Sequence, residues 1–316
     1  MKDFIKNLDI AVLIPCFNEE KTIEKVINDF RVHLPNSKIY VFDNCSTDDT
    51  ASIARKNNAE VRTVKHIGKG NVVRRMFADI EADFYILVDG DDTYDASRAP
   101  DMLRTILDKS LDMVIGKRVT SNTSGEYRFG HVFGNKILTQ SVSIFFGRGF
   151  TDMLSGYRVM SKRFVKSFPV MSSGFEIETE ITIHSLQILA PFEEVDTNYI
   201  SRPLGSESKL NTYSDGLRIL RMIFYLIKDG KPMQFFSFVS MLFFLTSVIV
   251  FIPIAQTFIE TGLVPRLPSV LLSTGLMILS FLSITTGIIL DSFSKSKLEN
   301  KILAYLCYPK YKISEK

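Results

Sequence analysis

The sequence predicts an α/β protein with a doubly wound, mainly parallel sheet, followed by two hydrophobic helices that cross a membrane. Short apolar runs alternate with segments of helical periodicity through about residue 116, which is typical of a parallel sheet between layers of helices. These runs end in polar residues, as expected where ligands gather at the carboxyl ends of parallel strands. Two uncharged stretches of about 20 residues then occupy the last third of the chain.

The first predicted strand, residues 10–14, and the segment after it form one βα unit. Apolar residues in that segment recur at helical spacing, at Ile23, Val26, Ile27 and Phe30. A second strand, residues 39–42, runs directly into Asp43 and a polar segment. The repeated βα pattern therefore places a carboxylate at the ligand-binding edge of the sheet.

A buried strand over residues 84–88 ends in three carboxylates around one glycine, Asp89-Gly90-Asp91-Asp92. Asp89 and Asp91 could present oxygens to one hard divalent ion, and Mg²⁺ or Mn²⁺ would keep coordination sites for the oxygens of a diphosphate. A solvated acidic turn is the alternative, because Asp and Gly are ordinary turn residues. The strand end is thus either a metal site or a polar turn.

The composition argues against several functions. A net charge of +3 over 316 residues is too small to indicate nucleic acid as the main partner. Three cysteines without CxxC spacing favour a reducing compartment, and four scattered histidines form no HExxH pair. The N-terminus is too polar for a signal peptide, so we expect residence on the cytosolic side. The turn Gly68-Lys69-Gly70 has neither the dinucleotide nor the P-loop spacing.

Residues 235–255 and 269–290 are the two predicted transmembrane helices, and a buried helix of a soluble protein is the alternative. The extracytoplasmic connector, residues 256–268, carries one basic residue, Arg266. Basic residues precede the first span at Arg218, Arg221, Lys228 and Lys231, and follow the second at Lys295, Lys297 and Lys301. By the positive-inside rule, both termini are expected in the cytosol.

Residues 215–234 alternate apolar and basic side chains, which predicts an amphipathic helix at the bilayer surface. A helix packed on the sheet is the alternative. The remaining divisions are a cytosolic domain over residues 1–214 and a cytosolic basic tail over residues 291–316.

Three motifs in this order resemble those of family 2 glycosyltransferases of the GT-A fold. They are Leu13-Ile14-Pro15-Cys16-Phe17-Asn18-Glu19, Asp43-Asn44-Cys45-Ser46-Thr47-Asp48 and Asp89-Gly90-Asp91. Two later stretches resemble the branch that glycosylates polyprenyl phosphates, such as dolichol-phosphate mannose synthases. These are Thr151-Asp152-Met153-Leu154-Ser155-Gly156-Tyr157-Arg158 and the segment from Arg202 through Ser208-Lys209-Leu210. The likeness covers roughly residues 8–230, and the family's usual Asp-Asp-Gly-Ser reads Asp43-Asn44-Cys45-Ser46 here.

The resemblance implies a site for a nucleotide sugar at the strand ends. By their match to the family motifs, Pro15, Phe17 and Glu19 line the nucleoside, Asp43 reads the base, and Asp89, Gly90 and Asp91 form the metal and diphosphate site. Lys69 matches a phosphate or ribose contact, with a solvated turn lysine as the alternative. Mg²⁺ or Mn²⁺ is the cofactor that the resemblance implies.

The resemblance also implies a site for the phosphate of a lipid acceptor. Arg118 and Arg128 resemble arginines that hold this phosphate, a task suited to a guanidinium because it pairs bidentately with phosphate oxygens. Arg202, Ser208 and Lys209 match loop residues that also contact this phosphate. Asp152 matches a position near the transferred sugar. Together with Asp91 and Arg118, Asp152 completes the predicted catalytic set. No role is assigned to the helix that contains Glu176, Glu178 and Glu180. Its acidic face could be solvated, structural or catalytic.

The implied reaction is the inverting transfer of a sugar from a nucleotide-diphosphate sugar, such as UDP-hexose or UDP-N-acetylhexosamine, to polyprenyl (undecaprenyl) phosphate. A phosphate monoester is already anionic at neutral pH, so it could attack without a general base. The product would donate a monosaccharide to lipopolysaccharide or another cell-envelope glycan, from the inner (cytoplasmic) membrane. A transferase that extends a glycan and a non-catalytic nucleotide-binding membrane protein are the alternatives, and self-association is left open.

Overall fold

The computed structural model describes residues 8–119, 150–200, 217, 221, 231–264 and 266–311. The chain divides into two compact units, one formed by Met1–Arg221 with Lys301–Lys316 and the other by Met222–Asn300. Most of the predicted amphipathic helix, residues 215–234, lies outside the described residues.

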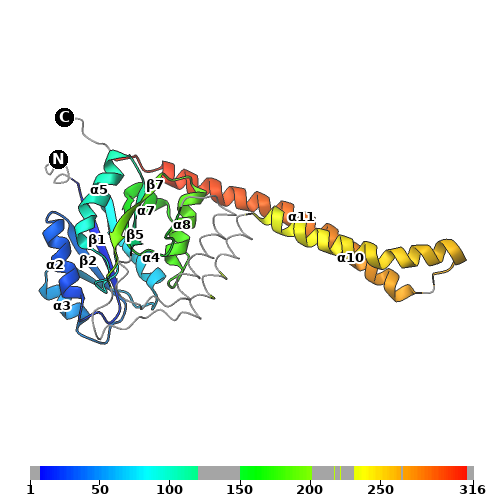
Figure 1. The fold of residues 1–316 in the computed structure, drawn as a ribbon, viewed down its shortest axis with the longest axis horizontal. Helices are drawn as coiled ribbons and strands as arrows, with labels where there is room; N and C mark the ends of the chain where they lie inside the picture. Colours follow the sequence, from blue (N-terminus) through cyan, green and yellow to red (C-terminus); the bar gives the residue numbers. More distant parts are fainter. Residues whose placement is uncertain are drawn as a thin grey trace. The chain divides into compact units, whose positions relative to one another are not determined.

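A mixed sheet forms the centre of the first unit, with seven strands among the described residues in the order β3-β2-β1-β4-β6-β5-β7 (Figure 1). The strands are β1 (Ile10–Cys16), β2 (Lys38–Asp43), β3 (Glu60–Thr63), β4 (Phe84–Leu87), β5 (Met113–Val119), β6 (Arg158–Ser161) and β7 (Phe192–Asn198). Strand β6 runs antiparallel to its neighbours β4 and β5, whereas the other pairs are parallel. The predicted α/β class with a mainly parallel sheet is therefore confirmed.

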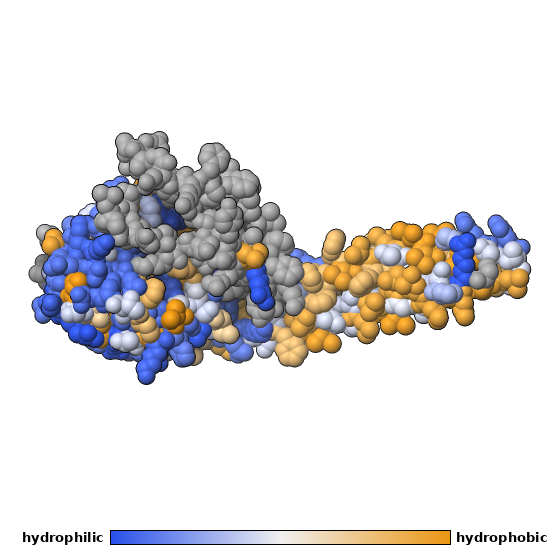
Figure 2. All heavy atoms as spheres, turned by 90° about the horizontal axis from the view of Figure 1, so that it is seen from below, coloured by the Kyte–Doolittle hydropathy of each residue, from blue (hydrophilic) through white to orange (hydrophobic). Residues whose placement is uncertain are grey.

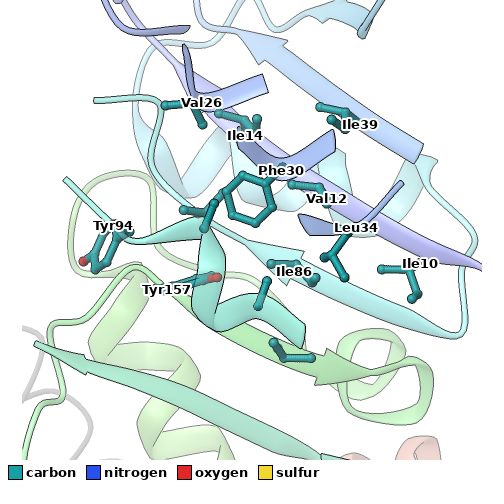
Figure 3. Close-up of a cluster of buried hydrophobic side chains, with 14 of the residues drawn as sticks. Ile10, Val12, Ile14, Val26, Phe30, Leu34, Ile39, Ile86, Tyr94 and Tyr157 are labelled. Atoms are coloured by element: carbon teal, nitrogen blue, oxygen red, sulfur yellow. The ribbon is translucent and has the colours of Figure 1, made fainter. Parts of the chain in front are cut away.

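Helices cover both faces of this sheet. They are α2 (Ile23–His33), α3 (Thr50–Lys56), α4 (Lys69–Asp79), α5 (Ala99–Asp108), α7 (Lys162–Ser167) and α8 (Ile177–Gln187), with a 3₁₀ turn η1 (Ala96–Arg98) before α5. On the face of α2 and α5, alternate residues of β1 such as Val12 and Ile14 pack with Phe30 and Ile86 (Figure 3). Each fully buried side chain of this size contributes about 1.5–3 kcal/mol to folding.

The opposite face of the sheet carries α4, where Phe77 packs edge-on against Tyr85 of β4 with ring centroids 6.4 Å apart. Leu13 of β1 is also fully buried, although it alternates with Val12. A strand buried on both faces explains why β1 is a continuous apolar run in the sequence rather than an alternating one.

Near its C-terminus the chain contacts the rest of the first unit through Tyr305 and Tyr311. The hydroxyl of Tyr305 donates a 2.5 Å hydrogen bond to Oδ2 of Asp112, whose side chain also accepts two hydrogen bonds from Arg163. The guanidinium carbon of Arg163 lies 4.6 Å from the centre of the Tyr305 ring. Because Asp112 is fully buried, these donors supply the pairing that a buried carboxylate requires.

We expect Tyr311→Ala to lower the free energy of unfolding of the first unit by about 1–3 kcal/mol. The Tyr311 ring lies 4.7 Å from the ring of Phe84, and its hydroxyl donates a 2.6 Å hydrogen bond to the carbonyl of Ile106. Thermal unfolding of the full chain in detergent measures the effect. Leu306→Ala, which truncates a side chain that is 67% exposed, is the control and should leave the transition in place; equal shifts for both variants would contradict the role of Tyr311.

The second unit contains the long apolar helix α10 (Pro232–Thr261) and most of α11 (Leu267–Leu306). Both helices are long and apolar enough to cross a membrane, and only 11% of each apolar window is buried. Figure 2 shows apolar side chains over the visible surface of this unit. Phe238, Ile249, Leu271 and Phe281 are among its exposed apolar residues. Such low burial does not fit the alternative of a core helix in a soluble protein.

Small polar residues line the contact between α10 and α11. The hydroxyl oxygens of Ser240 and Ser280 are 2.9 Å apart, and the Ser247 hydroxyl donates a 2.8 Å hydrogen bond to the Ser273 carbonyl. These positions are seven residues apart on each helix, so they repeat on one face. Small residues allow two helices to approach closely, and the hydroxyls are satisfied inside the contact.

Candidate active site

The ends of β1 and β2 carry two loops that are tied to each other. The backbone N–H of Asn18 donates to the Ser46 hydroxyl at 2.9 Å, and the N–H of Thr47 donates to Oδ1 of Asn18 at 2.8 Å. Asp43 at the end of β2 is buried, whereas the Phe17 side chain is 37% exposed. Hydrogen bonds therefore hold the two predicted nucleoside-binding motifs together, and Phe17 is exposed enough to stack on a ring.

Asn44 and Cys45 occupy the positions where this chain departs from the family pattern. The Asn44 amide donates to the carbonyls of Val64 and His66, both at 2.9 Å, and its oxygen accepts the N–H of Gly68 at 2.7 Å. Asn44 thus fixes the turn that precedes α4. Cys45 has a φ of 62°, a left-handed conformation that favours the glycine of the usual motif.

The acidic segment that follows β4 is held by burial and by hydrogen bonds. Asp91 is only 4% exposed, and its Oδ1 accepts hydrogen bonds from the Thr93 hydroxyl at 2.6 Å and the Thr93 N–H at 3.3 Å. The Thr22 hydroxyl, from the loop between β1 and α2, donates to the Gly90 carbonyl at 2.6 Å. This burial does not fit the alternative of a solvated acidic turn.

Lys69, at the start of α4, lies between two carboxylates. Its Nζ is 2.5 Å from Oδ1 of Asp89 and 2.5 Å from Oε1 of Glu178, and its side chain is 9% exposed. Burial disfavours the ammonium, but Asp89 and Glu178 outweigh that cost and raise the pKa of Lys69. Lys69 is therefore a charged, buried group and not a solvated turn lysine. Glu178 is the neighbour that the sequence did not identify.

The glycines on either side of Lys69 permit a close backbone contact. A Cβ atom at Gly68 would collide with the carbonyl oxygen of Ser173, and one at Gly70 with that of Ser172, in the loop of residues 171–174. Glu176 and Glu180 accept hydrogen bonds from backbone N–H groups of this same loop. These two acids thus hold the loop against the turn of Lys69, which gives them a structural role.

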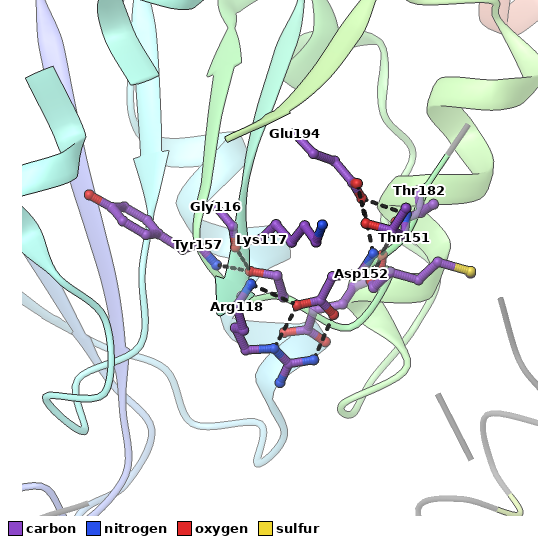
Figure 4. Close-up of polar contacts among 12 residues, drawn as sticks. Gly116, Lys117, Arg118, Thr151, Asp152, Tyr157, Thr182 and Glu194 are labelled. Atoms are coloured by element: carbon purple, nitrogen blue, oxygen red, sulfur yellow. Dashed lines mark hydrogen bonds and ion pairs between the residues drawn. The ribbon is translucent and has the colours of Figure 1, made fainter. Parts of the chain in front are cut away.

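Arg118 and Asp152, predicted separately, form a bidentate ion pair (Figure 4). Nε and Nη2 of Arg118 donate to the two carboxylate oxygens of Asp152 at 2.8 and 2.7 Å. Burial raises the carboxyl pKa, but these hydrogen bonds outweigh it and hold the pKa of Asp152 below its usual value. Glu194 of β7 fixes the loop by accepting hydrogen bonds from the N–H groups of Thr151 and Asp152, at 2.7 and 3.0 Å.

The segment after Asp152 lies against the acidic strand end. A Cβ at Gly156 would be 2.6 Å from Oδ2 of Asp89 and 3.2 Å from Nζ of Lys69. The N–H of Gly156 donates to the Tyr94 hydroxyl at 2.9 Å, and the Ser155 hydroxyl donates to the Gly116 carbonyl at 2.6 Å. Only glycine fits at position 156 without displacing the Asp89 carboxylate.

Arg158 is a second residue whose role the sequence did not reveal. It is fully buried in β6, and its guanidinium donates to the carbonyls of Ser155 at 3.0 Å and Met153 at 2.7 Å. It also donates to the carbonyl of Glu178 and the hydroxyl of Thr182 in α8, both at 3.0 Å. Arg158 therefore joins the loop of Asp152 to the first turn of α8.

The structure brings most of the predicted residues to one edge of the sheet. Around the strand ends lie Pro15, Phe17, Glu19, Asp43, Lys69, Asp89, Gly90, Asp91, Arg118 and Asp152. The predicted phosphate contacts Arg128, Arg202, Ser208 and Lys209 lie outside the described residues.

Sequence comparisons identify the family. Residues 11–168 match the family model described as "Glycosyl transferase family 2". The chain is 32% identical to "Glycosyltransferase AglJ" of Haloferax volcanii over 232 residues, which is 73% of this chain and 76% of the relative. It is 55% identical to "Protein RfbJ" of Shigella flexneri over 125 residues, which is 40% of this chain and 97% of that protein.

Solved structures show the same fold. A crystal structure of glucosyl-3-phosphoglycerate synthase from Mycobacterium tuberculosis with phosphoglyceric acid superposes with a TM-score of 0.57 at 21% identity, covering 70% of this chain and 80% of that one. The complex of the same enzyme with Mn²⁺, uridine-diphosphate and glucosyl-3-phosphoglycerate gives 0.53 at 23% identity, covering 64% and 75%. With the sheet, the strand-end motifs and these matches together, the chain belongs to glycosyl transferase family 2 and has the GT-A fold.

Proposed function

We propose that this glycosyltransferase moves a sugar, with inversion, from a nucleotide-diphosphate sugar to polyprenyl phosphate at a membrane. The observation that carries the proposal is a chain of contacts through two tyrosines. It runs from the acidic segment after β4 to the Arg118 guanidinium. A Cβ atom at Gly156 would collide with Asp89, and the N–H of Gly156 donates to the Tyr94 hydroxyl. The Tyr94 ring lies 5.4 Å from that of Tyr199, and the Arg118 guanidinium lies 5.6 Å from the Tyr199 ring.

The donor side would hold a divalent ion through Asp89 and Asp91. No cluster of three or more His, Cys, Asp or Glu side chains in the described ranges could hold a metal alone. Two carboxylates fit Mg²⁺ or Mn²⁺ because these ions take their remaining ligands from water and substrate phosphate oxygens. Such an ion, when bound, would neutralise charge on the departing nucleotide diphosphate. The Mycobacterium tuberculosis enzyme crystallised with Mn²⁺ and UDP supports a UDP-sugar, such as a UDP-hexose or UDP-N-acetylhexosamine.

The acceptor side would bind a phosphate through Arg118. Its guanidinium is oriented by Asp152, and its side chain is 19% exposed. The phosphate oxygen would attack the anomeric carbon, and the bond from that carbon to the nucleotide diphosphate would break. Because the phosphate is already deprotonated at neutral pH, the reaction needs orientation and charge stabilisation more than a base.

The two apolar helices support a lipid acceptor and a location in the inner membrane. Their exposed apolar surfaces match the bilayer interior. Basic residues before the first apolar stretch and after the second favour cytosolic termini. A lipid-linked monosaccharide made on the cytosolic side would serve as a donor for cell-envelope glycans such as lipopolysaccharide.

Incubation of the purified full chain with Mn²⁺, undecaprenyl phosphate and a panel of nucleotide sugars tests this proposal. Mass spectrometry of the lipid should detect one hexose or N-acetylhexosamine added per molecule with one preferred nucleotide sugar. Polyprenol without phosphate is the matched acceptor control and should remain unmodified. Transfer to an oligosaccharide, with none to the lipid phosphate, would favour a glycan-extending transferase instead.

A further inference from the structure

Glu178 is the one buried acid of α8 whose carboxylate pairs with the ammonium of Lys69. Its side chain is 6% exposed, and its Oε1 lies 2.5 Å from Nζ of Lys69. The neighbouring Glu176 and Glu180 instead accept hydrogen bonds from the backbone of residues 171–174. A buried carboxylate costs several kcal/mol unless it is paired, so this position is a poor choice for packing alone.

The position of Glu178 changes the charge balance at the strand end. Lys69 is within 2.5 Å of both Asp89 and Glu178, so one positive charge is shared between two negative charges. With Glu178 ionised, the three groups together carry one net negative charge. Without it, Lys69 would neutralise Asp89 alone, and the carboxylate would attract a divalent cation less strongly.

The backbone of Glu178 is anchored independently of its side chain. Its carbonyl accepts a 3.0 Å hydrogen bond from the buried guanidinium of Arg158, which also holds the Met153 and Ser155 carbonyls. The backbone that carries the Glu178 carboxylate is thus held in place. The backbone of Lys69 belongs to a turn that packs on residues 171–174. Neither partner is placed by a mobile surface chain.

We infer that Glu178 is a positioning residue that shares the Lys69 ammonium with Asp89 and so keeps the Asp89 carboxylate able to bind a metal–nucleotide complex. This role rests on the proposed donor site. It does not require Glu178 to touch the substrate. It predicts that removing the Glu178 charge weakens metal-dependent nucleotide binding only while Lys69 is present.

Isothermal titration of the full chain in detergent with UDP and Mn²⁺ tests the inference, alongside Mn²⁺ titration followed by electron paramagnetic resonance. Glu178→Gln should raise the dissociation constant for UDP with Mn²⁺ by about 10- to 100-fold, the value of one charge-assisted contact. In the Lys69→Met background the same substitution should have no further effect. Glu178→Asp, which keeps the charge, should bind more tightly than Glu178→Gln and serves if the amide variant does not fold.

The exposed pair of Lys109 and Glu193, with 2.7 Å between Nζ and Oε1, is the matched control. Glu193→Gln and Lys109→Met make the same chemical changes away from the site and should leave UDP binding unchanged. Equal binding by wild type and Glu178→Gln, or an equal loss in both Lys69 backgrounds, would overturn the inference. Absence of Mn²⁺-dependent UDP binding by the wild type would instead overturn the proposed donor site.

Discussion

Asp91→Asn is expected to lower turnover by at least about 100-fold while leaving the fold intact. The substitution removes one negative charge and nearly preserves shape. Oδ1 of Asp91 accepts hydrogen bonds from the N–H and the hydroxyl of Thr93, and the carbonyl of an asparagine can still accept these two. What is lost is the charge that would bind a divalent ion and thereby stabilise the departing diphosphate.

Sugar transfer measured across Mn²⁺ concentrations, together with the thermal unfolding curve, checks this expectation. Asp92→Asn is the matched control because it makes the same chemical change at a carboxylate that pairs instead with Lys25, at 2.6 Å, whose side chain is 59% exposed. Asparagine also tolerates the positive φ of 58° at that position. Wild-type activity of Asp91→Asn in the presence of EDTA would contradict the metal assignment.

Arg158→Met should cause the largest loss of stability, about 3–5 kcal/mol, because it leaves several buried carbonyls without their donor, each at a cost of about 1–3 kcal/mol. The carbonyls of Met153, Ser155 and Glu178 would each lose the hydrogen bond that Arg158 supplies. The same loss would release the Asp152 loop from α8, so activity should fall with stability.

Thermal unfolding of the full chain in detergent measures the effect, which should be a decrease in midpoint of about 10 °C. Arg104→Met is the control because the Arg104 side chain is 54% exposed and its nearest acid, Asp101, is 3.6 Å away. An unchanged midpoint for Arg158→Met would show that the buried guanidinium does not hold these elements together.

Periodicity predicted the architecture because most buried strands of this sheet are continuous apolar runs. Strand β6 is the exception that a parallel pattern could not reveal. It has four residues, starts with the buried Arg158, and runs antiparallel between β4 and β5. An arginine at the start of a strand is usually exposed to solvent. The carbonyls that accept the hydrogen bonds of Arg158 come from a loop and a helix whose positions depend on the tertiary fold.

The motifs predicted the donor carboxylates, but not the pairs that surround them. Lys69 and Glu178 are distant in sequence and meet where Ser172 and Ser173 pack on the glycines beside Lys69. Helix α8 buries Glu178, Thr179, Thr182 and Ser185 alike, so its polar composition does not separate a buried face from a solvated one. Arg118 and Asp152 were both predicted as site residues, yet their pairing required the sheet order that brings β5 beside β6.

The nucleotide released during transfer to undecaprenyl phosphate tests the central claim most directly. Attack of the lipid phosphate on the anomeric carbon breaks the bond between that carbon and the diphosphate. The proposed reaction therefore releases one nucleoside diphosphate per lipid and adds only the sugar mass to the lipid monophosphate. Chromatography of the nucleotide and mass spectrometry of the lipid from one reaction should give both values. Release of a nucleoside monophosphate, with a lipid carrying a sugar diphosphate, would contradict it.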